Sequence, residues 1–214
     1  MIYLNKGHTS KQLRQSPNFF RNAYPSANKW GIPTLKKSPI DLTNMQFIGA
    51  DKTNKNAPKF HSLKTIHFFL EDNKLDRYYK SPKSFLSKFA QYRYILTPDY
   101  SLYVDMPTAL QLYNTFRNRY CGAVWQDNGL IVIPTISWST NESFEFCFDG
   151  IEEGSVVAIS TLGSRKEKQL FLNGYFEMIK RIQPTNVLCY GKPFTEMGNE
   201  IIYIDYLNTT GRVK

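Results

Sequence analysis

Residues 155–190 read SVVAIS, TLGS, RKEKQLFLNGYFEMIKRI, QPT and NVLCY in succession. The first and last of these segments are short apolar runs, whereas the long segment between them mixes apolar and charged residues with the period of an α-helix. A strand, a helix and another strand in this order form a βα unit followed by a parallel strand. The apolar side chains of the helix share one face: Leu170, Tyr175, Met178, Ile179 and Ile182.

The same alternation continues upstream and downstream, so we predict an α/β fold with a mostly parallel sheet, either open or curved into a partial barrel. Helices are expected at 83–92, 107–128 and 165–182, the second beginning near Pro107 and capped by Gly129. The stretch 139–148 fits either a short helix or a strand. Strands are expected at Thr65–Leu70, Tyr94–Thr97, Leu130–Pro134, Ser155–Ser160, Asn186–Tyr190 and Glu200–Ile204.

The first 59 residues differ in composition from the rest and predict a basic, mostly irregular arm, followed by one α/β domain at 60–214. Residues 1–60 hold ten Lys or Arg against Asp41 and Asp51, whereas the remaining residues hold 17 basic and 16 acidic ones. Apolar residues around Trp30–Pro33 indicate that the arm docks on the domain. The stretch 53–58 is the best candidate for a linker, and any attraction to phosphate belongs to the arm or to local clusters.

Other features of the chain limit its class. No apolar stretch approaches the roughly 20 residues that cross a bilayer, and residues 1–13 lack the apolar core of a signal peptide, so we expect a cytoplasmic protein with no membrane partner. The three cysteines (Cys121, Cys147 and Cys189) are far apart among apolar neighbours, as buried small side chains are. A Cys–His nucleophile is disfavoured because His8 and His61 lie in or beside the polar arm, which leaves only His67.

In parallel α/β sheets, the loops that follow the strands share one edge, and ligands bind there. These loops place carboxylates, hydroxyls, an indole and a lysine together, with no histidine unless His67 points inward. Asp99, with Glu71 or Asp72, is the candidate for acid–base catalysis or for holding Mg²⁺ or Mn²⁺, the alternative being solvated turn residues. No metal-ligating set is assigned. The candidate ligand-binding residues of the loops are Ser101, Ser137, Trp138, Thr161, Gly163 and Lys192.

Two further groups have both a functional and a structural interpretation. The turn from Thr161 to Ser164 precedes a helix, so its backbone N–H groups would suit a phosphate, although a plain helix N-cap explains the same residues better. Arg117 and Arg119 lie among aromatic residues of the 107–128 helix. They would either grip phosphate beside stacked bases, or lay their stems along apolar surface and pair their guanidinium groups with Asp or Glu.

A series of ordered motifs resembles one known family. It includes LTPDYSLY at 96–103 with DMP at 105–107, and it continues with Trp125-Gln126, VIPT at 132–135 and FCFDG at 146–150. The chain resembles the family called domain of unknown function 4417, found in phages, prophages and mobile elements of bacteria. The resemblance spans about 66–192 and leaves out the arm. It implies a phage or mobile-element protein acting in replication, host takeover or counter-defence inside a bacterial host cell.

Three functions remain open on these residues. The first is binding of a phosphorylated ligand, a nucleotide or nucleic acid, at the strand-end loops. The second is a carboxylate- or metal-dependent hydrolase or phosphodiesterase that uses Asp99. The third is an inhibitor that blocks a host protein by direct contact through the arm and exposed aromatic residues.

Overall fold

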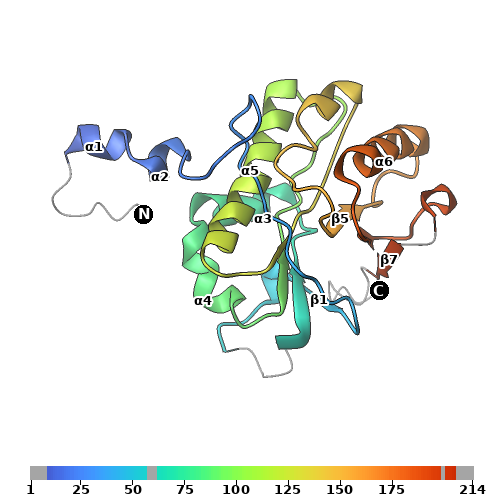
Figure 1. Ribbon diagram of the computed structural model, residues 1–214, viewed down its shortest axis with the longest axis horizontal. Helices are drawn as coiled ribbons and strands as arrows, with labels where there is room; N and C mark the ends of the chain where they lie inside the picture. The colour runs from blue at the N-terminus through green and yellow to red at the C-terminus, as the bar shows by residue number, and fades with distance from the viewer. Residues whose placement is uncertain (1–8, 57–61, 199–200, 206–214) are drawn as a thin grey trace.

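The computed structural model describes residues 9–56, 62–198 and 201–205, and these form two parallel sheets flanked by helices (Figure 1). The strands in this part of the chain are β1 (Gln46–Gly49), β2 (Lys64–His67), β3 (Tyr94–Leu96), β4 (Val132–Ile133), β5 (Val157–Ser160), β6 (Val187–Tyr190) and β7 (Ile201–Ile204). The α-helices are α1 (Ser10–Arg14), α2 (Pro17–Phe20), α3 (Asp72–Lys80), α4 (Leu86–Phe89), α5 (Thr108–Asp127) and α6 (Lys168–Ile182). Short 3₁₀ turns are η1 (Ala50–Lys52), η3 (Pro82–Phe85), η4 (Asn141–Glu145) and η5 (Thr195–Met197).

The strands lie in the order in which they occur along the chain. One sheet has the order β1-β2-β3-β4 and the other β5-β6-β7, with every pair parallel. Just beyond β4, the N–H of Ile136 donates to the carbonyl of Ala158 and the N–H of Ala158 donates to that of Pro134, both at 2.8 Å, which joins the two sheets. This confirms the predicted α/β fold. No pairing closes β7 onto β1 among the described residues, so the sheet remains open.

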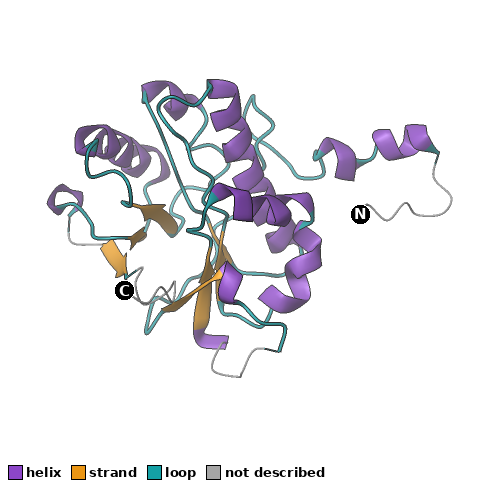
Figure 2. Cartoon of the chain, turned by 180° about the vertical axis from the view of Figure 1, so that it is seen from behind, coloured by secondary structure: helices purple, strands orange, loops and turns teal. Residues whose placement is uncertain are grey.

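Both faces of strands β3 to β6 are buried, which explains their nearly unbroken apolar sequences. One face of the first sheet packs against α3, α4 and α5 through residues such as Ile66, Ile95 and Trp125. The corresponding face of the second sheet packs against α6 (Figure 2). The alternate residues, among them Leu96 and Ala158, form a third core that both sheets share.

The expected strands are all present, each shorter than its apolar run by one to three residues. The expected cap of α5 is also confirmed, because Gly129 has φ 82° and its N–H donates to Gln126 while the N–H of Leu130 donates to Trp125. The stretch 139–148 contains η4 and turns but no strand.

Four elements among those described were not expected: the short arm helices α1 and α2, helix α3 and strand β1. Helix α3 lies before the first predicted helix. It was not predicted because its sequence, DNKLDRYYK, is mostly polar and buries only Leu75 and Tyr78. The helix expected at 83–92 is broken into η3 and α4. Strand β1 lies within the stretch predicted to be irregular and forms the edge of the first sheet beside β2.

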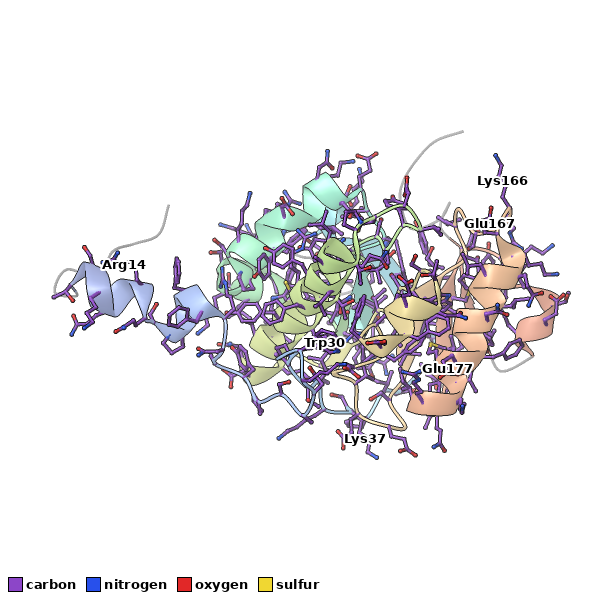
Figure 3. The ribbon with its side chains drawn as sticks, turned by 90° about the horizontal axis from the view of Figure 1, so that it is seen from above. Arg14, Trp30, Lys37, Lys166, Glu167 and Glu177 are labelled. Atoms are coloured by element: carbon purple, nitrogen blue, oxygen red, sulfur yellow. The ribbon has the colours of Figure 1, made fainter. Side chains whose placement is uncertain are left out.

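The arm docks on the domain through its second half. Ile32 and Leu35 are fully buried, and the indole N–H of Trp30 donates to the carbonyl of Glu145 at 3.1 Å. Helices α1 and α2 extend away from the body of the molecule (Figures 1 and 3). Of the candidate linker, residues 53–56 are irregular, while Ala57 and Pro58 lie outside the described residues, as do His8 and His61.

Candidate functional site at the strand ends

Two adjoining cavities lie where β2, β3, β4 and β5 end. The first, which we call the tryptophan cavity, has a volume of about 300 Å³ and apolar walls that include Trp138, Phe171 and Leu162. The second, the lysine cavity, has a volume of about 600 Å³ and is lined in part by Lys52 and Lys74. Asp99, Ser101, Tyr103, Ser160 and Leu162 line both. The cavities are therefore two parts of one depression at the edge that the topology selects for ligands.

Asp99 lies on the boundary between the two cavities, three residues after the last residue of β3. Its Oδ1 accepts a hydrogen bond of 2.7 Å from the hydroxyl of Ser137. Burial raises the pKa of the Asp99 carboxyl to about 7, the nearby Asp72 adds to this rise and the Ser137 hydroxyl opposes it. A carboxyl group with this pKa exchanges its proton near neutral pH, as a general acid or base must.

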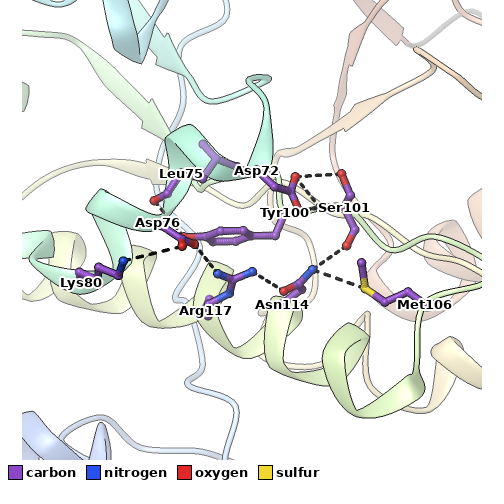
Figure 4. A network of polar contacts seen from close by, with 9 residues as sticks. All are labelled: Asp72, Leu75, Asp76, Lys80, Tyr100, Ser101, Met106, Asn114 and Arg117. Carbon is purple, nitrogen blue, oxygen red and sulfur yellow. Dashed lines mark hydrogen bonds and ion pairs between the residues drawn. The ribbon is translucent and has the colours of Figure 1, made fainter.

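Asp72 holds the segment that follows Asp99. The side chain of Asp72, in the first turn of α3, accepts hydrogen bonds from the hydroxyl of Ser101 at 2.9 Å and from its N–H at 3.2 Å (Figure 4). The carbonyl of Ser101 in turn accepts from the amide of Asn114 on α5 at 2.7 Å. Ser101 is thus fixed from two helices at the edge of both cavities.

Arg117 supports this network from behind. Its guanidinium donates to Asn114 and to Asp76 of α3, the latter at 2.7 Å, and it lies 3.8 Å from the ring centroid of Tyr100 (Figure 4). Arg117 is in neither cavity lining and lies behind the residues that are.

Arg119 is also removed from the cavities. It is only 2% exposed, and its guanidinium donates to the carbonyls of Thr135, Cys147 and Asp149 at 2.9–3.1 Å. Burial lowers its pKa to about 10, which still leaves it charged at neutral pH. The partners of this guanidinium are thus backbone carbonyls of the protein itself.

Trp138 forms one wall of the tryptophan cavity. Its ring lies 4.9 Å from that of Phe171, and its indole N–H donates to the Phe171 carbonyl at 3.1 Å. Next to it, Ser139 also lines the cavity, is 2% exposed and has a hydroxyl with no hydrogen-bond partner in the described part of the chain. A buried hydroxyl of this kind is available to a polar atom of a ligand.

The loop after β5 differs from the sequence expectation. Helix α6 begins at Lys168 instead of Arg165, and no side chain caps it, so the expected N-cap is not formed. The Thr161 hydroxyl donates to the carbonyl of Lys192 at 3.0 Å, and the Ser164 hydroxyl donates to that of Thr161 at 2.9 Å. Gly163 lines the tryptophan cavity, whereas Thr161 and Lys192 line neither cavity.

The charged groups divide unevenly between the cavities. Asp99 and Glu167 are the charged residues of the tryptophan cavity lining. The lining of the lysine cavity holds Lys52 and Lys74 together with four carboxylates, one of which, the exposed Glu71, pairs with Lys74 at 3.0 Å. In the described ranges, no three His, Cys, Asp or Glu side chains lie together in a way that could hold a metal ion.

His67 lies buried beside the lysine cavity. Its ring centroid is 5.2 Å from that of Tyr190, which stacks on Phe69 at 4.2 Å, and both of these aromatic residues line that cavity. Burial lowers the pKa of His67 to about 4, so the imidazole is neutral at physiological pH. The three cysteines are free and buried as expected, and burial raises the pKa of each thiol.

Several lining residues were not predicted. Ser160 is the last residue of β5, Leu162 follows it, and Tyr103 lies in the exposed loop before α5. A predicted site that also took in the last residue of each strand and a few more residues of each following loop would have included them. No helix in the described portion of the chain is both long and apolar enough to cross a membrane.

The fold and the site together define an open parallel α/β protein with ligand-sized cavities at the carboxyl ends of its strands. Within this class, the chain belongs to the family described as Domain of unknown function (DUF4417), whose model matches residues 24–207. The match confirms the family predicted from the motifs. It extends beyond residues 66–192 and includes the docked half of the arm.

Two phage proteins are similar to the chain. It is 41% identical to the Gene 1 protein of Mycobacterium phage L5 over 180 residues, which are 80% of this chain and 76% of that protein. It is 38% identical to the Gene 1 protein of Mycobacterium phage D29, again over 80% of this chain but over 64% of that longer protein. No solved structure matches the chain.

Proposed function

We propose that the protein binds a small phosphorylated molecule in the strand-end cavities and that Asp99 exchanges a proton with it. The observation that carries the proposal is the position of Asp99, between the two cavities and with a pKa raised to about 7. Where a carboxyl group transfers a proton at physiological pH, its surroundings raise its pKa toward 7.

The linings support a ligand with two chemically different parts. The tryptophan cavity combines apolar and aromatic walls with the hydroxyls of Ser101, Ser137 and Ser139, which suits an uncharged ring with polar edges. The lysine cavity supplies Lys52 and Lys74, which suit a phosphate. A nucleotide has both parts, and cavities of about 300 and 600 Å³ are of a size for one such molecule.

The reaction that this arrangement supports best is hydrolysis of a phosphate ester. Asp99 in its ionised form would take a proton from an attacking water, and in its protonated form it would give one to the leaving oxygen. Ser137 orients the carboxyl through its 2.7 Å hydrogen bond. This joins the ligand-binding hypothesis to the Asp99 hydrolase hypothesis, and it assigns no metal ligand.

Calorimetry and thermal unfolding with nucleoside monophosphates and cyclic nucleotides would test the proposal. Ligand at about one hundred times its Kd should raise the Tm by about 5 °C or more. Lys52→Ala/Lys74→Ala should weaken binding of nucleotides but not of nucleosides. Asp99→Asn should retain binding and lose turnover, whereas Asp105→Asn, a substitution of an exposed carboxylate outside both linings, should change neither.

The same experiment has clear contrary outcomes. Nucleotide binding that survives the double lysine substitution would reject the phosphate site. Turnover that Asp99→Asn leaves intact would reject the proton-transfer role. A profile of kcat against pH that lacks an apparent pKa near 7 would argue against Asp99 in the same way.

A further inference from the structure

The arm carries a second surface, separate from the cavities, which consists of Lys11, Arg14, Phe19 and Phe20. Helices α1 and α2, which hold these residues, extend beyond the body of the molecule, with Arg14 at the far end from Lys166 (Figure 3). The family match begins only at residue 24, after both helices. This surface is therefore an addition to the domain that contains the cavities.

The first 40 residues of the arm carry charge of one sign. Residues 1–40 contain seven Lys or Arg and no Asp or Glu, the first acidic residue being Asp41. The remaining chain is nearly balanced, so the positive charge is concentrated in this segment of the chain. A partner that complements this segment is a polyanion.

Two aromatic side chains of the same surface face solvent. Phe19 is 63% exposed and Phe20 54%, and their rings lie 5.9 Å apart at an angle of 68°. Phenylalanine side chains this exposed lie flat against unpaired bases in proteins that bind single-stranded nucleic acid, where lysine and arginine follow the phosphates. Paired bases in a duplex do not offer their faces in this way.

The surface has a fixed attachment to the domain. The guanidinium of Arg21, the residue after α2, donates to the hydroxyl of Tyr120 at 3.2 Å and to the carbonyl of Lys80 at 3.4 Å. It also lies 5.1 Å from the ring centroid of Tyr79 and 5.0 Å from that of Tyr120. These contacts hold the base of the arm on α3 and α5 while α1 and α2 project from it.

From these observations we infer that the arm binds single-stranded nucleic acid, with Lys11 and Arg14 on the phosphates and Phe19 and Phe20 against the bases. The site is independent of the small-molecule cavities, which have no residue in common with it. A nucleic-acid strand bound by the arm would thereby be held on the same molecule as the proposed Asp99 chemistry.

Fluorescence anisotropy with a labelled 20-nucleotide oligothymidylate tests the inference on the full chain. Raising salt from 50 to 200 mM should weaken binding roughly tenfold, as expected for two to three phosphate contacts. Lys11→Glu/Arg14→Glu should lower affinity at least roughly tenfold and flatten the salt dependence. Phe19→Ala/Phe20→Ala should lower affinity by a similar factor and leave the salt dependence unchanged, because stacking releases no counterions.

A matched control distinguishes the charge of the arm from the net charge of the whole protein. Lys166→Glu/Lys180→Glu makes the same change in net charge on exposed lysines at the α6 end of the molecule, and it should reduce affinity by less than about threefold. Asp99→Asn should bind the oligonucleotide as the unaltered protein does. Failure of the cavity proposal would then leave the arm result intact, and the reverse holds as well.

Three results would overturn the inference. Equal affinity for a 20-base-pair duplex would reject recognition of unpaired bases. Equal loss of binding in the α6 control would show that only net charge matters. Unchanged affinity in both arm variants, combined with capture of one host protein that survives nuclease and high salt, would assign the arm to a protein partner instead.

Discussion

The indole of Trp138 lies against the Cα of Gly174 on α6. A Cβ at position 174 would lie 2.6 Å from the indole Cγ, and closer still to Cδ1 and Nε1, so the helix can approach this ring only where it carries no side chain. The wall of the tryptophan cavity thus depends on a glycine in the middle of a helix, where glycine is otherwise unfavourable by about 1 kcal/mol.

Gly174→Ala should therefore displace the indole, in spite of the better helix propensity of alanine. We expect a loss of about 1–3 kcal/mol in the free energy of unfolding, together with weaker ligand binding in the cavity. Urea unfolding measures the first effect and calorimetry the second. Asn173→Ala, at the exposed neighbouring position, is the control and should cost less than about 0.5 kcal/mol. An alanine at 174 that is neutral in both assays would show that the ring moves freely.

Asp99 should make the protein less stable as the pH rises. The folded-state pKa of Asp99, about 7, is above its ordinary value of 3.8. Between these two pH values, the folded protein therefore keeps a proton that the unfolded chain has already released. The stability from this group is complete below about pH 4 and is lost as the pH rises through 7, by about 4 kcal/mol. Asp99→Asn should remove that part of the difference between pH 5 and pH 8 in urea unfolding.

His67 should act in the opposite direction. The folded-state pKa of His67, about 4, lies below the ordinary value of 6.5. Between these two pH values, the unfolded chain therefore binds a proton that the folded protein does not bind. The stability from this group is complete above about pH 6.5 and is lost as the pH falls toward 4, by about 3 kcal/mol. His67→Phe should unfold with less dependence on acid than the unaltered protein. If both proteins lose stability equally between pH 7 and pH 5, the imidazole is protonated in the fold.

Arg119 should be essential for stability without contacting a ligand. Arg119→Met would leave the carbonyls of Thr135, Cys147 and Asp149 without their donor, at a cost of about 3 kcal/mol or more in urea unfolding. Arg119→Lys should not restore it, because an ammonium group lacks the planar fork that reaches several carbonyls. Arg14→Met, at an exposed position, should be neutral. A stable Arg119→Met variant with weakened ligand binding would return this residue to the ligand site.

The sequence predicts most of the sheet because the strands are buried on both faces. Apolar runs such as Ser155–Ser160 have few other interpretations when helical segments lie between them. Strand β1 was missed because QFIG is a short run in polar surroundings, and α3 was missed because only two of its nine residues are buried. In both elements tertiary contacts outweigh local pattern.

The site was predictable where it depends on topology and not where it depends on side-chain direction. Asp99, Ser101 and Ser137 line the cavities because strand ends meet at one edge of a parallel sheet. Arg119 was a candidate because its sequence neighbours are aromatic, yet the helix turns it toward buried carbonyls. Spacing along a sequence does not distinguish a guanidinium that meets a ligand from one that bonds to the protein's own backbone.

The order of the strands also bears on how the chain folds as it is synthesised. Each strand from β2 to β7 lies beside the strand that precedes it in the sequence, including the junction between Pro134–Ile136 and Ala158. None of the strands in the described ranges pairs with a strand from the far end of the chain, so loop-closure entropy is lost in small steps. A growing chain can therefore add one βα unit at a time, beginning at the ribosome exit with the first sheet.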